Sequence, residues 1–447
     1  MEVPRPIQNL IDHANAIAGG TGMPSKLFKL EATLITPNEQ IELLVPNGRA
    51  RSCQFGTGAS DNMQIRGQLQ PGLYQNRVLP FKDNLYMEVV KRIGYSQTVT
   101  RYRAIPLGDT NAQMQGGNTA LANMEAKDEM NIITVKFQLL ETGFAMLKNE
   151  IVADNFLMAK LDKVLHGLLT EYGEQLQLTG ADAFKGVDIE YPFDNDRIFQ
   201  RITIPSSQGI KLIELADWMQ NDDQFGFYSK GIVQYYRKGM WFIRPAMKLG
   251  RYDTARKTVD IYRLPENVMP TVENSYFIEG NKLTILATGN ATMSDGKDIN
   301  KQNNGVGYRV VSPDAISGET GLYYEKGQAM TTRGDSMSEY QTSKRGSGEE
   351  IVPFHGTPSS NLCKMFTKNA ANDGVEQTIS WHNSYAEWID PATPCRYFYM
   401  NGDVLMYKEG TILSLYSVDQ MDTQSQSPVF REHTEVGMFL NKEENFG

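Results

Sequence analysis

Hydrophobic residues near the N-terminus recur at helical spacing. Between residues 6 and 18 they form one stripe of a helix, made up of Ile7, Leu10, Ile11, Ala14, Ile17 and Ala18. Pro6 suits the first turn, where its missing N–H costs nothing, and Gly19 with Gly20 ends the pattern. We therefore predict an amphipathic helix within residues 1–26, which buries its stripe either on its own chain or on a neighbouring subunit. The residues expected at a subunit contact are Ile7, Leu10, Ile11 and Ile17.

From residue 27 onward the pattern changes to the alternation of apolar and polar residues that is typical of strands. The alternation is clearest in residues 133–139, where Ile133, Val135, Phe137 and Leu139 share one face. Further strand-like runs, separated by Pro, Asn and Gly, lie at 32–35, 41–45, 63–65, 86–90 and 98–105. We predict a first β-rich domain over residues 27–195, including a helix at 154–172 between a cap at Asp154 and a stop at Gly173. The stretch between Leu107 and Asp128 has no clear period and is predicted to be a long loop.

Residues 202–258 follow a different order of elements. A short extended piece at 202–205 precedes a helical pattern that ends near Met219. A dense aromatic run then occupies 225–228, 235–236 and 241–242. The segment Arg237-Lys238-Gly239-Met240 between two aromatic strands is predicted to be a hairpin turn. The whole segment is predicted to be a small α/β domain.

The C-terminal part is predicted to be a second β-rich domain over residues 259–447. Its clearest element is a hairpin on a type I′ turn at Asn401-Gly402, between strands 395–400 and 403–408. A second turn at Glu409-Gly410 is predicted to lead into a third strand. The polar, Gly/Ser/Asn-rich stretch 288–348 is interpreted as an insertion in this domain.

Composition fits a large, turn-rich protein without a membrane segment. The 447 residues suggest several domains, and 40% hydrophobic residues suffice for folded cores. The three cysteines, Cys53, Cys363 and Cys395, are widely spaced and are interpreted as reduced thiols. No apolar run reaches about eighteen residues, and no secretory signal pattern opens the sequence.

The net charge of −9 argues against a protein that wraps nucleic acid. One segment is nevertheless basic, and its cations are Arg237, Lys238, Arg244, Lys248, Arg251, Arg256, Lys257 and Arg263. With the aromatic residues it could form a nucleic-acid surface. We favour packing on the acidic surface of a neighbouring subunit, with Arg237, Arg244 and the strand residues Trp241 and Phe242 as interface residues.

The sequence offers no convincing catalytic, cofactor or metal site. None of its five histidines has metal-ligand spacing with a second histidine or a cysteine, and no phosphate-binding loop is present. Gly334-Asp335-Ser336-Met337 has the motif of one esterase class. That class also needs an Asp-x-x-His pair, which the sequence lacks. We therefore predict that the protein is not an enzyme and binds no cofactor.

The order of parts in residues 202–276, which is helix, Phe-Gly-Phe-Tyr, strand, turn and strand, resembles the tail or baseplate hub proteins of tailed bacteriophages. The resemblance implies an α+β fold, predominantly β, with two β-barrel domains related to tail-tube subunits plus the small α/β domain. It also implies a homotrimeric ring of the virion, assembled in the host bacterial cytoplasm. Such a hub joins the tail tube to the spike, contacts other baseplate proteins and lets DNA pass during genome ejection.

Two other functions remain open at this stage. One is another tail or neck component, such as a tube terminator or a portal-proximal protein. The other is a β-rich carbohydrate-binding adhesin, in which Trp241 and its aromatic neighbours would form a sugar platform. A hydrolase that uses Ser336 is a third and weaker alternative.

Overall fold

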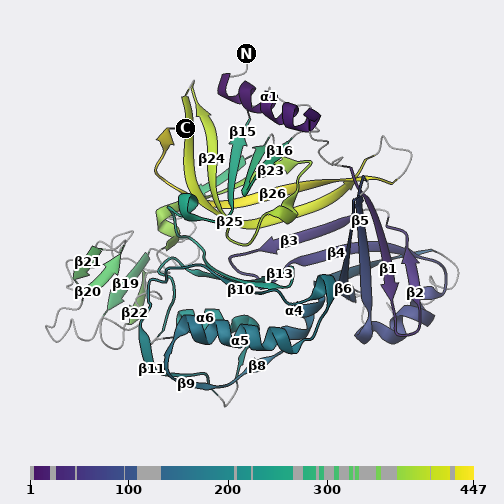
Figure 1. Ribbon diagram of the computed structural model, residues 1–447, viewed down its shortest axis with the longest axis horizontal. Coiled ribbons are helices and arrows are strands. Elements are labelled where there is room, and N and C mark those ends of the chain that lie inside the picture. Colours follow the sequence, from purple (N-terminus) through teal and green to yellow (C-terminus); the bar gives the residue numbers. More distant parts are fainter. Residues whose placement is uncertain are drawn as a thin grey trace.

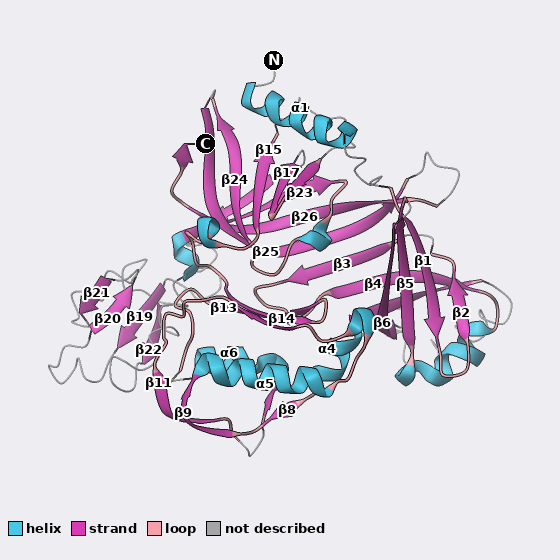
Figure 2. Ribbon diagram, viewed as in Figure 1, coloured by secondary structure: helices cyan, strands magenta, loops and turns pink. Residues whose placement is uncertain are grey.

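A large mixed β-sheet dominates the molecule, and a small α/β unit lies beside it (Figures 1 and 2). The computed structural model describes residues 5–20, 27–45, 48–94, 96–107, 132–205, 209–222, 225–264, 275–287, 291–295, 307–311, 322–325, 328–331, 349–353, 370–402, 404–422 and 428–446. The predominance of strands confirms the β-rich character predicted from the sequence. No helix in these ranges is long and apolar enough to cross a membrane.

The N-terminal half of the large sheet has the strand order β3-β4-β7-β6-β5-β1-β2. Its strands are β1 (Lys29–Ile35), β2 (Gln40–Leu43), β3 (Arg49–Gln54), β4 (Asn62–Leu69), β5 (Tyr86–Ile93), β6 (Ser96–Leu107) and β7 (Ile133–Glu141). Val135, Phe137 and Leu139 of β7 are buried on one face, as their alternation predicted. Beyond β2, Leu44 and Gln68 exchange backbone hydrogen bonds of 3.3 and 2.7 Å, which bring the end of β2 beside β4.

The C-terminal half of the same sheet contains β15 to β18 and β23 to β27. These strands are β15 (Thr258–Arg263), β16 (Tyr276–Glu279), β17 (Lys282–Ala287), β18 (Ala291–Asp295), β23 (Gly374–His382), β24 (Pro394–Asn401), β25 (Val404–Met421), β26 (Phe430–Asn441) and β27 (Asn445–Phe446). The pairing of Asn401 with Val404 confirms the predicted hairpin at Asn401-Gly402. Cys395 is buried with a free thiol, as is Cys53 in β3.

Strand β25 joins the two halves of the sheet. It is 18 residues long, and it pairs first with β24, then with both β26 and β3. The turn predicted at Glu409-Gly410 is wrong, because β25 runs straight through it. Gly410 instead permits a close strand approach, since a Cβ there would lie 2.1 Å from the carbonyl oxygen of Phe439.

The small α/β unit has a three-stranded sheet in the order β10-β14-β13. Figure 1 shows helices α5 and α6 between this sheet and the short strands β8, β9 and β11. The elements are α4 (Thr142–Leu147), β8 (Ile151–Val152), β9 (Asn155–Lys160), α5 (Leu161–Gln175), β10 (Gly186–Ile189), β11 (Ile198–Thr203), β12 (Ile210–Lys211), α6 (Leu215–Asn221), β13 (Ile232–Arg237) and β14 (Met240–Pro245). The predicted hairpin turn is confirmed, with positive φ angles of 55° at Lys238 and 79° at Gly239.

Helix α5 differs from its prediction in its start and in its packing. It begins at Leu161, and the residues after Asp154 form strand β9, which pairs with β11. Leu165 of α5 shares one hydrophobic cluster with Met219 of α6 and Trp241 of β14. The helix that we grouped with the first β domain therefore packs with the small sheet.

Helix α1 (Arg5–Gly20) covers part of the large sheet of its own chain (Figure 1). Its buried residues Ile7, Ile11 and Ala14 form a cluster with Leu264, Phe277 and Leu286, and Leu10 packs against this cluster. His13 also bonds to Glu279 at 2.9 Å. The side chain of Ile17, a further predicted contact residue, lies outside the described part.

Short elements complete the description. The remaining strands are β19 (Gly307–Val311), β20 (Leu322–Glu325), β21 (Gln328–Thr331) and β22 (Glu349–Pro353). Short helical turns span Tyr74–Val78, Leu79–Asn84, Gly180–Asp182, Leu212–Glu214, Tyr252–Thr254, Ala370–Asp373 and Ala386–Trp388. Ser336, Cys363 and the predicted loop between Leu107 and Asp128 lie outside the described residues.

Candidate functional site: a buried ion-pair network

Eight charged side chains meet where the two halves of the large sheet contact the β13–β14 hairpin. We call this group the ion-pair network. It consists of Arg49, Arg51, Asp61, Lys91, Arg237, Glu387, Asp419 and Glu432. All of these residues except Glu387 are buried. Buried charges are costly unless they are paired, so removal of one partner would leave an uncompensated charge at this junction.

One part of the network joins the first half of the sheet to the second. Arg49 on β3 donates from Nε to Asp419 on β25 at 2.8 Å and from Nη2 to Glu387 at 3.2 Å. Lys91 on β5 lies 3.3 Å from Glu432 on β26. Burial alone would raise the pKa of Glu387, but the cations Lys91 and Arg49 outweigh it and hold that pKa far below its usual value.

A second part holds the β13–β14 hairpin. Arg237, at the end of β13, places its Nε 3.2 Å from Oδ2 of Asp61, and the Tyr235 hydroxyl donates to Oδ1 of Asp61 at 3.0 Å. Burial raises the pKa of Asp61, and the opposing field of Arg237 and Arg51 leaves it below its ordinary value. Arg237 also donates to the backbone carbonyls of Ile389 and Ala386, so it contacts both halves of the large sheet.

A carboxylate also accepts hydrogen bonds from the turn of this hairpin. Glu141, the last residue of β7, accepts from the backbone N–H groups of Lys238 at 2.9 Å and Gly239 at 3.3 Å. Burial, reinforced by the charge of Asp61, raises the pKa of Glu141 to about 7. Burial and the neighbouring Arg237 lower the pKa of Lys238 to about 8. The side chain of Lys238 donates to the carbonyl of Glu387, so the turn is also fastened to the C-terminal half.

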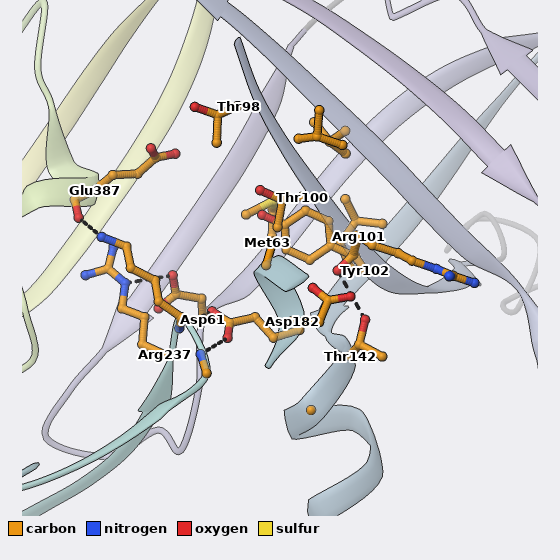
Figure 3. Close-up of a pocket in the computed structure, with 18 of the residues that line it drawn as sticks. Asp61, Met63, Thr98, Thr100, Arg101, Tyr102, Thr142, Asp182, Arg237 and Glu387 are labelled. Atoms are coloured by element: carbon orange, nitrogen blue, oxygen red, sulfur yellow. Dashed lines mark hydrogen bonds and ion pairs between the residues drawn. The ribbon is translucent and has the colours of Figure 1, made fainter. Parts of the chain in front are cut away.

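A pocket of about 260 Å³ opens beside the network (Figure 3). Strands β3 to β7 line one side, and Asp182, Lys185 and the hairpin turn line the other. Figure 3 shows Arg237 beside Asp61, and Asp182 close to Thr142, whose hydroxyl donates to the carbonyl of Arg101 at 3.2 Å. Among the described residues, no three His, Cys, Asp or Glu side chains are grouped to hold a metal ion.

The structure places three of the predicted interface residues inside this chain's own core. Trp241 is 0% exposed because it packs in the cluster with α5, and Arg237 is 1% exposed because it enters the network. Phe242 is 6% exposed, and the guanidinium of Arg244 lies over its ring. Arg244 is half-buried; it pairs with Asp188 and donates to the carbonyl of Pro391 at 3.0 Å. These side chains therefore make their contacts within the chain and leave little exposed surface for a neighbouring subunit.

Three more cations of the basic segment are paired in the same way. Arg251 pairs with Glu190, and Lys248 lies 3.4 Å from Asp194. Lys257 lies 2.8 Å from Asp390. We had expected acidic partners on a neighbouring subunit, but these partners belong to the same chain. Most of the segment's charge is thus paired within the chain, which also disfavours a nucleic-acid surface there.

Sequence reasoning missed most of the network. Asp61, Glu141, Glu387 and Glu432 lie far apart in the chain and have no shared motif. One signal was present, because Arg49, Arg51 and Cys53 alternate along β3 and all three side chains are buried. Two arginines on the inward face of a strand require carboxylates from elsewhere.

Comparisons with known proteins find similarity only to solved structures. No family model matches the chain, and no curated protein matches its sequence. The 43 kDa tail protein of prophage MuSo2 from Shewanella oneidensis is 10% identical, with a TM-score of 0.47, over 92% of this chain and 96% of that one. A chain of the Francisella PdpA–VgrG complex is 10% identical, with a TM-score of 0.43; the match covers 99% of this chain but 57% of that one.

A chain of the phage P2 baseplate in its activated conformation is 8% identical, with a TM-score of 0.32. That match covers 93% of this chain and 99% of the baseplate chain. At such low sequence identities, the similarity concerns the fold alone. The chain is structurally similar to phage tail and baseplate proteins.

Proposed function

We propose that the protein is a non-catalytic structural component of a phage tail or baseplate, and that it acts as the hub that joins the tail tube to the spike. The order of elements in residues 202–276 supports this proposal through its resemblance to tail hub proteins. The β-rich architecture with one small α/β unit fits the same class.

The observation that carries the proposal is the way in which three parts of the chain are fastened together. Strand β25 makes one sheet of the two halves, and the ion-pair network fixes the β13–β14 hairpin to both. A component that transmits a push from tube to spike must resist shear between its parts. Continuous backbone pairing and desolvated, paired charges provide that resistance, since separating them would expose charges without partners.

We propose further that each half of the sheet corresponds to one barrel related to tail-tube subunits. Closure of the first barrel is supported by the backbone hydrogen bonds between Leu44 and Gln68, which follow the order β4-β7-β6-β5-β1-β2 back to β4. Three chains would then form a ring with six barrels. Such a ring would match a sixfold tube on one side and a threefold spike on the other.

Passage of DNA through the ring fits the distribution of charge. The chain carries a net charge of −9, and the cations of its basic segment are largely paired with its own carboxylates. An acidic lumen repels the DNA backbone and lets it move without adhering. The adhesin alternative is disfavoured, because a sugar platform needs an exposed ring and Trp241 is buried.

Antibodies raised against the purified chain test the proposal when they are applied to intact and tail-sheared virions. We expect label at the end of the tail that bears the spike, and its loss when the serum is first adsorbed with the purified chain. Label confined to the capsid or the neck would contradict a hub and favour a neck component. An absence of the chain from purified virions would exclude a structural role.

A further inference from the structure

Arg51 differs from the other cations of the ion-pair network. Its side chain is 5% exposed and lines the 260 Å³ pocket, yet its Nε has no hydrogen-bond partner within the described part of the chain. Its nearest carboxylates, Glu387 and Glu432, lie 3.7 and 3.8 Å from its terminal nitrogens. A guanidinium has five N–H donors, and a buried one normally satisfies them.

The carboxylates near Arg51 are already occupied by other donors. Glu387 accepts from Arg49 at 3.2 Å, and Glu432 accepts from the backbone N–H of Ala386 at 2.9 Å and from Lys91 at 3.3 Å. Asp61 is held by Arg237 and Tyr235. The donors of Arg51 therefore remain available to a group that enters the pocket.

Further cations line the other walls of the pocket. Arg101 of β6 lies on one side, and Lys185 with Lys238 lies on the side of the small α/β unit. The acidic residues on these walls have their own neighbours, since Glu141 accepts two backbone N–H groups and Asp182 lies close to Thr142, Lys185 and Arg101. Donors thus exceed free acceptors inside a partly desolvated cavity, where charge-assisted hydrogen bonds are strongest.

We propose that this pocket is a binding site for a small oxyanion, either a phosphate or a carboxylate group, held by the guanidinium of Arg51. Arginine matches both groups, because its planar fork can donate two parallel hydrogen bonds. The volume admits one such group with a few waters. The ligand would lie between the N-terminal half of the large sheet and the β13–β14 hairpin, and would stabilise their contact.

Calorimetric titration of the purified full-length chain with inorganic phosphate, and separately with acetate, tests the site. We expect saturable binding of at least one anion, weakened on the order of tenfold in Lys185→Gln, which removes a cation at the exposed edge of the pocket, and more strongly in Arg51→Gln. Arg92→Gln removes an exposed cation on the same strand as Lys91 but outside the pocket, and should bind as the wild type does.

The two anions identify the source of the ligand. Binding of phosphate indicates a free phosphate or phosphoryl ligand, whereas binding of acetate alone indicates a carboxylate, such as an acidic side chain of a neighbouring protein. Because Arg51→Gln could unfold the junction, circular dichroism must first show a native spectrum, and Lys185→Gln provides the independent reading. If neither anion binds, or if binding is unchanged in Lys185→Gln and in folded Arg51→Gln, then water alone satisfies Arg51 and the proposal is wrong.

Discussion

Arg237 and Asp61 form a buried ion pair, with Nε of the arginine 3.2 Å from Oδ2 of the aspartate and both side chains less than a tenth exposed. The pair joins the end of β13 to the segment that precedes β4. Because Arg237 also donates to the carbonyls of Ala386 and Ile389, one side chain links all three parts of the molecule.

Asp61→Asn should destabilise the protein strongly. The substitution keeps the shape of the side chain and an acceptor for Tyr235, but leaves Arg237 as a buried charge without its counter-ion. We expect the free energy of unfolding to fall by about 3 kcal/mol. Urea unfolding followed by fluorescence measures it as a lower midpoint with an unchanged slope.

The matched control is the exposed pair Arg92–Glu31, whose side chains are 49% and 51% exposed. Glu31→Gln should cost less than about 1 kcal/mol, because water screens the charges. The double variant Asp61→Asn/Arg237→Met should recover part of the loss, since no lone charge remains. Equal effects of Asp61→Asn and Glu31→Gln would show that the buried network does not hold the junction.

Two glycines of α5 should respond in opposite directions to alanine. A Cβ at Gly173 would lie 2.5 Å from the ring of Phe184, so Gly173→Ala should lower stability by about 1–3 kcal/mol. A Cβ at Gly167 meets nothing within 4 Å, so Gly167→Ala should raise stability by up to about 1 kcal/mol through helix propensity. Thermal unfolding of the two variants shows whether each substitution raises or lowers stability. Higher stability in both variants would contradict the packing of α5 on Phe184.

His433 should make the protein less stable in mild acid. Burial, with the charge of His382 at a ring distance of 4.3 Å, lowers the pKa of His433 below 6.5, and Glu435 opposes this only in part. A base whose pKa is lowered in the folded state stabilises the protein fully above pH 6.5, the ordinary pKa of histidine. This stability is lost as the pH falls below 6.5, because the unfolded chain then binds a proton that the folded chain does not. The difference in unfolding free energy between the wild type and His433→Gln should therefore shrink from pH 8 to pH 5.5.

His382→Gln serves as the second variant for this effect. It removes the neighbouring positive charge but leaves the burial of His433, so the acid loss should be smaller than in the wild type and should not vanish. A wild type and a His433→Gln variant with parallel pH profiles would show that His433 is not the source.

Docking of α1 should depend on Ile7. Its side chain is almost fully buried against Leu264, Phe277 and Leu286, so Ile7→Ala should remove about 2–4 kcal/mol from the docking of the helix. Hydrogen exchange should then show loss of amide protection in α1 while the large sheet keeps its own. Asn9→Ala, on the exposed face, is the control. Unchanged protection in Ile7→Ala would mean that other contacts hold the helix.

Local elements could be predicted from the sequence wherever neighbouring residues determine them. The Asn401-Gly402 turn fixes its own hairpin, and the stripe of α1 follows from helical spacing. The strand at 155–160 was mistaken for the start of a helix, because its apolar residues continue the helical spacing of α5 and only the pairing with β11 makes them a strand. Likewise Gly410 resembles a turn residue until β26 is placed against it.

The ion-pair network could not be predicted because its partners are distant in sequence. Arg49 and Asp419 are 370 positions apart, and Arg237 and Ile389 are 152 apart. A single sequence shows which side chains are charged, but only the fold brings them together. The pairing of the cations in residues 244–257 could not be predicted for the same reason, since their carboxylates lie in β10, in the residues just after it and at residue 390.

The central claim, that this chain is a ring-forming tail component, is tested most directly by its mass in solution. Light scattering should be run on the purified chain alone and after mixing with tail-tube and spike proteins. We predict a trimer of three 50.3 kDa chains, formed by the chain itself or on addition of the spike. A monomer that persists in every mixture would contradict the account.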